Sequence, residues 1–412
     1  MNSLTSNVTE TASPIAELER ADVLDALRGF ALLGILISHI PDFSGYSFLA
    51  SPERSALDRF GIDEWILSLQ QFLIRGKFFS LFSLLFGIGF AVQLEGAARR
   101  GAQFSRHFAR RLAVLFVIGL LHAALWYGDI LKDYALIGLI LILCARWDTR
   151  RIAWVAACVL ALRMLWPMLM IAIVPFILKS DGTSNPATSF SATAQAFGSG
   201  NPATIFAANL SLLKIKALQM VYDGKAISVL GMFFVGALIG KLGLYRNIHK
   251  HRRILGLCLA VCGPIGIIGN AFLVRLHSGT PDYPPTGPWV IEQCLFAVAV
   301  PALTFAYASA FALVWSRLGG GVLRIFALPG RMALTTYVSQ TMLCIALFYG
   351  IGLGLIGCLG AAEGTLAAIA MFGMQCALAG LWLRYFRFGP LEWVWRRATY
   401  GRPISIFRNP EG

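Results

Sequence analysis

Long apolar runs separated by short polar segments recur along the whole chain. A helix that crosses a membrane needs roughly 20 mostly apolar residues. Ten apolar runs are candidate spans, of which the fourth is short, and they lie near residues 24–42, 77–97, 112–128, 133–145, 152–178, 226–243, 254–274, 289–315, 331–356 and 360–383. The short alternating segments typical of a membrane β-barrel are absent. The pattern predicts an all-α, polytopic membrane protein, a helical bundle of about ten transmembrane helices.

The polar segments divide the chain into five predicted parts. These are a disordered cytoplasmic tail without signal-peptide features (1–20), an N-terminal five-span half (21–178), an extracytoplasmic polar loop (179–225), a C-terminal five-span half (226–386) and a cytoplasmic interfacial tail (387–412). Two further stretches, 61–75 and 389–401, place apolar residues at helical spacing and are predicted to lie along the membrane surface.

The charge distribution gives the orientation. Only 14% of the residues are charged, against about 25% in soluble proteins. The net charge of +14 comes from basic residues in short loops on one side of the predicted bundle. This is the positive-inside pattern of proteins whose partner is the lipid bilayer, and it argues against nucleic acid binding. Both termini are then predicted to be cytoplasmic.

The sequence lacks the common soluble catalytic and metal-binding motifs. The eight cysteines lie in apolar runs without a C-x-x-C spacing, which is typical of small buried side chains, so no metal site is predicted. No P-loop, G-x-S-x-G or H-E-x-x-H occurs. Glycines spaced by four, Gly236/Gly240 and Gly350/Gly354, are more typical of close helix packing than of a site.

The first predicted span carries an arginine and a histidine eleven positions apart, Arg28 and His39. At about 100° and 1.5 Å per residue, the two side chains share a helix face and lie about 16 Å apart along the axis. Arg28 is placed to bind the phosphates of a coenzyme A at the cytoplasmic end, and His39 to act as a general base at the far end. Alternatively, Arg28 is an anchor paired with Asp25, and His39 is a helix-end histidine bonded to a neighbour.

A second polar cluster surrounds the turn between the third and fourth spans. His122 lies in the outer half of the third span, and Asp129 and Asp133 flank the turn. A carboxylate there can orient a catalytic histidine, and spacing alone suggests Asp129 for His39. The alternatives are a solvated turn that caps the fourth span, and an interhelical hydrogen bond from His122.

Further polar residues stand within or beside apolar runs. Arg163 lies mid-span, which is costly unless the side chain faces a cavity or a partner. Arg163, Arg331 and Lys77 are candidates for binding the acyl-CoA phosphates, with an interfacial anchor as the alternative for Lys77. The candidates for lining a polar substrate tunnel are Tyr337, Gln340, Trp126 and Tyr134. For the polar residues of the ninth span, interhelical hydrogen bonding is the alternative.

Several motifs resemble the DUF418 (YeiB-like) membrane proteins. They are L-D-A-L-R-G-F-A-L-L-G-I-L-I, K-F-F-S-L-F-S-L-L-F-G, L-H-A-A-L-W-Y-G-D-I-L, G-R-M-A-L-T-T-Y-V-S-Q-T and G-P-L-E-W-V-W-R-R-A-T-Y-G, which together cover roughly residues 20–405. The N-terminal half is also similar to transmembrane acyltransferases of the acyltransferase-3 and heparan-glucosaminide acetyltransferase types. In acyltransferase-3 proteins an R-x10-H on the first span is implicated in acyl-CoA use and catalysis, and Arg28 and His39 match that pattern.

The resemblance implies a multi-pass enzyme of the bacterial plasma (inner) membrane. It would move an acyl group from cytoplasmic acyl-CoA to a hydroxyl or amine of an acceptor, which is a glycan, a lipid or a small molecule. DUF418 relatives often carry Asn near the position of His39, a departure that sets this chain apart. A small-molecule transporter or permease is the alternative, and a scaffold or sensor is a third; a homo-oligomer is compatible with each.

Overall fold

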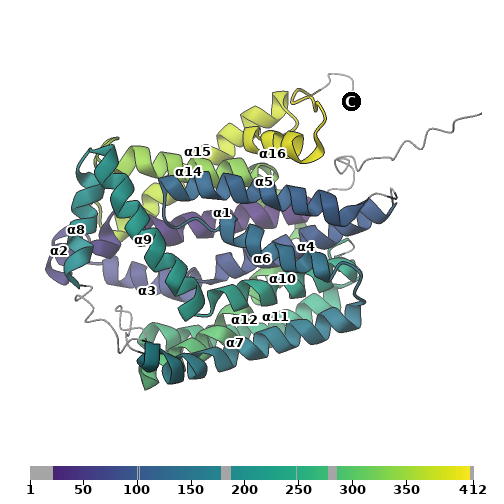
Figure 1. Cartoon of the computed structure of the whole chain (residues 1–412), viewed down its shortest axis with the longest axis horizontal. Coiled ribbons are helices and arrows are strands. Elements are labelled where there is room, and N and C mark those ends of the chain that lie inside the picture. The colour runs from purple at the N-terminus through teal and green to yellow at the C-terminus, as the bar shows by residue number, and fades with distance from the viewer. Residues whose placement is uncertain are drawn as a thin grey trace, which may run out of the picture.

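A computed structural model describes residues 22–99, 101, 103–177, 187–246, 248–276 and 285–408 of the chain. Within these ranges the protein is helical and has no β-strand, apart from one isolated bridge between Phe386 and Phe407. The predicted tail at residues 1–20 lies outside the described residues. The fold is a polytopic bundle of helices, as the apolar pattern predicts (Figure 1).

Eight helices of the described chain are long and apolar enough to cross a membrane. They are α1 (Asp22–Phe43), α4 (Lys77–Arg99) together with the preceding α3 (Asp63–Leu73), α5 (Phe104–Leu125), α7 (Thr149–Ile177), α9 (Pro202–Tyr222), α11 (Arg252–Leu276), α12 (Gly287–Leu318) and α15 (Ala361–Tyr385). Three shorter helices stand where the fourth, sixth and ninth spans were predicted, namely α6 (Leu131–Leu143), α10 (Lys225–Lys241) and α14 (Ala333–Phe348).

Short elements connect these helices. They are η2 (Tyr46–Phe48), α2 (Ser51–Leu57), α8 (Ala187–Gly198), η4 (Gly321–Phe326), α13 (Ala327–Arg331) and α16 (Pro390–Tyr400). The two stretches predicted to lie along the membrane surface are helices, α3 and α16. Their position relative to a membrane stays a prediction.

The prediction of a polar loop over 179–225 is wrong for its described part, because this part forms α8 and α9. Asn201 caps α9 by accepting hydrogen bonds from the backbone N–H groups of Ala203 and Thr204, and Pro202 occupies the first turn. Figure 1 shows α9 running steeply across the other long helices rather than alongside them. Because the residues before 202 are polar, the sequence pattern assigns the apolar helix of 21 residues that follows them to the same loop.

The two described ends of the chain lie at the same end of the bundle. Arg331, which precedes α14, bonds Asp22 at the start of α1 over 2.9 Å. At the other terminus the buried Glu392 of α16 accepts hydrogen bonds from the backbone N–H groups of Leu334 and Thr335 in the first turn of α14. The described ends therefore lie together, as two termini on one side require. The assignment of that side to the cytoplasm stays a prediction.

Glycines set how closely α4 and α10 approach. A Cβ added at Gly236 would stand 2.1 Å from the backbone oxygen of Leu84, and one at Gly240 would stand 2.5 Å from the Cβ of Ala91. This pair packs helices together as predicted. Gly350 and Gly354 do not pack two helices together, because α14 ends at Phe348 before both of them. Gly354 stands in the following turn with φ +69° and open space around it.

We expect Gly236→Ala to destabilise the bundle by about 1–3 kcal/mol, because the backbone of α4 must move to accept the methyl group. Gly256→Ala is the matched control, since a Cβ at that position of α11 meets nothing within 4 Å. Thermal unfolding of the two purified variants in the same detergent measures the difference. Equal melting temperatures would contradict the close approach of α4 and α10.

Candidate functional site

A cavity of about 690 Å³ lies between the C-terminal end of α1, the α3–α4 junction, the α5–α6 turn and the facing parts of α7, α9, α10 and α12. Its size is within the range of small-molecule sites. Charged side chains line it from nearly every element. They are Asp42, Arg54, Arg75, Asp129, Lys132, Asp133, Arg163, Lys216, Asp223, Lys225 and Glu292. Of the predicted site residues, those that line the cavity are His39, Asp129, Arg163, Tyr134 and Tyr337.

His39 stands at the wall of this cavity, near the C-terminal end of α1. Its ring packs edge-on against Trp126, with ring centroids 4.6 Å apart, and Trp126 in turn stacks on Phe43. In the described part of the chain no side chain or backbone group forms a hydrogen bond with the imidazole of His39. The charged side chains that act on the ring are Asp42 and Lys216. A half-buried histidine without a hydrogen-bond partner is available to a bound molecule.

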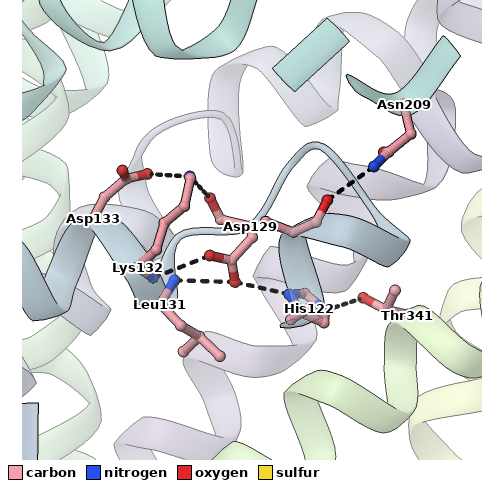
Figure 2. A network of polar contacts seen from close by, with 8 residues as sticks. His122, Asp129, Leu131, Lys132, Asp133, Asn209 and Thr341 are labelled. Atoms are coloured by element: carbon pink, nitrogen blue, oxygen red, sulfur yellow. Dashed lines mark hydrogen bonds and ion pairs between the residues drawn. The ribbon is translucent and has the colours of Figure 1, made fainter. Parts of the chain in front are cut away.

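His122 and Asp129 form a buried pair behind Trp126. The Nδ1 atom of His122 lies 2.7 Å from a carboxylate oxygen of Asp129, and its Nε2 lies 2.9 Å from the Thr341 hydroxyl (Figure 2). Because an ionised carboxylate only accepts hydrogen bonds, Nδ1 carries a proton, and Nε2 shares a hydrogen bond with the threonine hydroxyl, which can donate or accept. Both nitrogens of His122 are therefore occupied.

The partner of Asp129 is thus His122, and the pairing of Asp129 with His39 suggested by the spacing is not formed. Asp129 also accepts hydrogen bonds from the backbone N–H groups of Leu131 and Lys132, so it caps the first turn of α6. The turn between α5 and α6 brings the carboxylate back toward α5, from which His122 projects. Asp129 therefore bonds the histidine that is seven positions away in the sequence, and not His39, which lines the same cavity.

The α5–α6 turn is also where α9 is attached to the bundle. The side-chain amide of Asn209 donates hydrogen bonds to the backbone oxygens of Ala123 and Ala124 at the end of α5. Figure 2 shows Asn209 reaching this turn on the side opposite to Thr341. This attachment holds α9 across the cavity, into which its Lys216 projects.

Arg28 and Arg331 lie at the other end of α1, away from the cavity. Arg28 bonds Asp25 over 2.5 Å, one turn earlier on the same helix. Arg331 bonds Asp22 and lies 3.9 Å from the buried Asp25. Arg28 therefore pairs with Asp25, as the alternative interpretation of this residue predicts. The guanidinium stays about a quarter exposed and donates one of its five N–H groups to Asp25.

The remaining predicted site residues make contacts within the protein. Lys77 is buried and donates to the backbone oxygen of Gln71 over 2.7 Å, so it does not lie at a surface. Gln340 bonds Gln375 of α15 over 3.2 Å. The hydroxyl of Tyr134 lies 2.6 Å from that of Ser83, which is an interhelical hydrogen bond. Trp126 lies behind His39 and does not reach the cavity wall.

Comparisons with known proteins give the family. Residues 239–402 match the family described as "Protein of unknown function (DUF418)". The chain is 31% identical to the uncharacterized protein YxaH of Bacillus subtilis (strain 168), over 94% of this chain and 96% of that protein. The chain belongs to the DUF418 family. It is also 30% identical to the uncharacterized protein YeiB of Escherichia coli (strain K12), over 93% and 97% of the two chains. No solved structure matches it.

The DUF418 fold brings three further residues to the site that the sequence did not single out. Thr341 follows Gln340 directly, and the polar ninth span was its signal. Asp42 follows His39 by three positions, a helical spacing that places it at the same cavity. Lys216 had no signal, because α9 was predicted as loop. Across the described residues, no cluster of His, Cys, Asp and Glu is arranged to hold a metal ion.

Proposed function

We propose that this DUF418 protein is an acyltransferase embedded in the bacterial plasma (inner) membrane. It takes the acyl group of cytoplasmic acyl-CoA and transfers it to a hydroxyl or amine of an acceptor that binds in the 690 Å³ cavity. The observation that carries the proposal is the imidazole of His39. This ring stands at the wall of a charged cavity without a hydrogen-bond partner among the described residues, on the helix that carries Arg28 at its other end.

His39 acts as the general base in this proposal. It accepts the proton of the acceptor hydroxyl or amine as that group attacks the thioester carbonyl. The C–S bond breaks as the new C–O or C–N bond forms, and the imidazolium returns the proton to the departing thiolate, so that free CoA leaves as a thiol. No oxidant, reductant or further reactant is needed.

His122 and Asp129 act as positioning residues. Asp129 fixes the tautomer and orientation of His122, and the rings of His122 and Trp126 lie 6.3 Å apart. Trp126 is in turn the ring against which His39 packs. This chain of contacts holds the catalytic imidazole while leaving both of its nitrogens to the reactants.

Arg28 is the proposed contact to the phosphates of the donor. Its bond to Asp25 fixes the guanidinium, and its other N–H groups stay open to a phosphate. It faces Gly89 of α4, where the absence of a side chain leaves room beside the guanidinium. The 16 Å or so that separate Arg28 from His39 along the helix match the reach of an extended pantetheine arm.

The first experiment is donor binding. We expect acetyl-CoA or a longer thioester to raise the melting temperature of the purified protein, and Arg28→Ala to lose this shift. Arg151→Ala is the control, because Arg151 is largely exposed at the start of α7 and pairs only with Asp148. Equal stabilisation of wild type and Arg28→Ala would remove Arg28 from the donor site. No stabilisation by any CoA thioester, with solute uptake into proteoliposomes lacking a donor, would favour a transporter.

A further inference from the structure

Arg163 is a buried arginine at the wall of the cavity, away from His39 along the chain. Its Nε donates to the Ser228 hydroxyl of α10 over 3.1 Å, and one terminal nitrogen donates to the amide oxygen of Gln293 on α12 over 2.8 Å. The other terminal nitrogen is buried without a hydrogen-bond partner. The side chain is only 2% exposed. Two neighbouring helices thus hold the guanidinium in place while part of it stays unused.

No carboxylate pairs with Arg163 within the described chain. Both of its acceptors are neutral, and the carboxylate that acts on it, Asp223, is bonded to Lys225 over 3.1 Å. A charge buried without a counter-ion costs several kcal/mol of stability in a typical protein. An ionisable residue at membrane depth usually faces the bundle interior or a cavity and points to a functional site.

Lys216 is a second cation of the cavity, and no carboxylate forms an ion pair with it in the described part of the chain. Its ammonium lies over the Tyr127 ring, whose centroid is 5.6 Å from Nζ. Lys216 acts electrostatically on His39 and also on Lys225, which neighbours Asp223. It therefore lines the same cavity as the proposed catalytic histidine and Arg163, within electrostatic range of His39 and of Lys225.

The local backbone is shaped to bring Arg163 there. Gly224, between α9 and α10, has φ +63°, and a Cβ added to it would stand 2.8 Å from the Trp166 ring and 3.2 Å from Cδ of Arg163. The indole N–H of Trp166 donates to the backbone oxygens of Val221 and Tyr222, which end α9. The junction of α9 and α10 is thereby fastened beside the guanidinium.

We infer that Arg163 and Lys216 form a phosphate-binding subsite, and that the molecule occupying the cavity carries a phosphate group. A guanidinium with an unused nitrogen and an ammonium that lines the same cavity offer donors to several oxygens of one phosphate. The inference that the acyl acceptor carries a phosphate rests on the proposed function. The inference that the cavity binds a phosphate group does not. A phospholipid headgroup and a soluble phosphate ester share this chemistry.

The test is ligand-dependent thermal unfolding of the full chain in phospholipid-free detergent, without acyl-CoA. One arm adds inorganic phosphate, against chloride at equal ionic strength. The other adds phosphatidylglycerol to the micelles, against diacylglycerol with the same acyl chains. We expect one of the two phosphates to raise the melting temperature. The arm that responds identifies a soluble ester or a lipid headgroup as the source.

We expect Arg163→Met and Lys216→Met each to weaken this binding by about 10- to 100-fold, the effect of losing a charged hydrogen bond. Arg275→Met and Lys214→Met are the controls, because these side chains are exposed on α11 and α9. Without ligand, Arg163→Met should change the melting temperature little, because removal of a buried charge without a counter-ion offsets the hydrogen bonds lost to Ser228 and Gln293, whereas a purely structural role would lower it.

Three results would overturn the inference. They are no shift with either phosphate, equal shifts in wild type and both variants, and an unliganded Arg163→Met that melts well below wild type. The proposed function fails separately, through the absence of acyl transfer or of binding by CoA thioesters. Phosphate binding that depends on Arg163 in a protein without transfer would leave the subsite standing and point to transport of a phosphate compound.

Discussion

His39→Ala loses acyl transfer by at least about 100-fold, the contribution typical of a general base, while the protein still binds acyl-CoA. Without the imidazole, the acceptor loses the group proposed to take its proton. The proposed donor contact, Arg28, lies at the other end of α1, so we expect it to be unaffected. Release of the free CoA thiol in the presence of membrane extract measures the rate, and thermal shift with acetyl-CoA measures donor binding.

The same variant should cost little stability. His39 has no hydrogen-bond partner in the described structure, so its removal leaves no buried polar group unpaired and loses only the packing against Trp126. His107→Ala is the matched control, because this half-buried histidine of α5 does not line the cavity, bonds the backbone oxygen of Gln103 and packs near Tyr400. Full transfer activity in a folded His39→Ala variant would exclude His39 as the base and with it the proposed mechanism.

The helical fold could be predicted because apolar length is a strong signal. The segments around α1, α4, α5, α7, α11, α12 and α15 each carry enough apolar residues to cross a membrane. By contrast, α9 was missed because its first residues follow a stretch rich in Ser, Thr, Asn and Gly. Its steep path across the bundle is set by tertiary contacts such as that of Asn209 with the end of α5, and periodicity carries no such information.

The sequence predicted several residues of the site, but it predicted less well which of them contact each other. A histidine or an arginine in an apolar run stands out because burying it is costly, and this signal found His39 and Arg163. Which groups meet depends on how turns and neighbouring helices return the chain. Thr341 meets His122 from 219 positions away, and no spacing within one helix encodes that contact. Arg28 shows the reverse case, since its partner Asp25 follows directly from helical geometry.

Asp129→Ala should destabilise the protein by about 1–3 kcal/mol for each buried donor that it leaves without an acceptor. The substitution leaves Nδ1 of His122 without its acceptor and frees the backbone N–H groups of Leu131 and Lys132 at the start of α6. Because Asn209 attaches α9 to the same turn, we expect the loss to spread to the wall that carries Lys216. Thermal unfolding and limited proteolysis of the α8–α9 region measure the two effects.

Asp129→Asn removes the charge and keeps one acceptor oxygen. One oxygen of Asp129 accepts from Nδ1 of His122 and from the Leu131 N–H, and the other accepts from the Lys132 N–H. The amide NH2 of an asparagine must face one of these donors, so part of the cap or the bond to His122 is lost. We therefore expect a smaller loss of stability than in Asp129→Ala, with transfer activity reduced where His122 and Trp126 shift. Asp133→Asn is the matched control, since that carboxylate pairs with Lys132 and is partly exposed. If Asp133→Asn were as damaging as Asp129→Asn, the charge of the turn and not the His122–Asp129 bond would hold the site together.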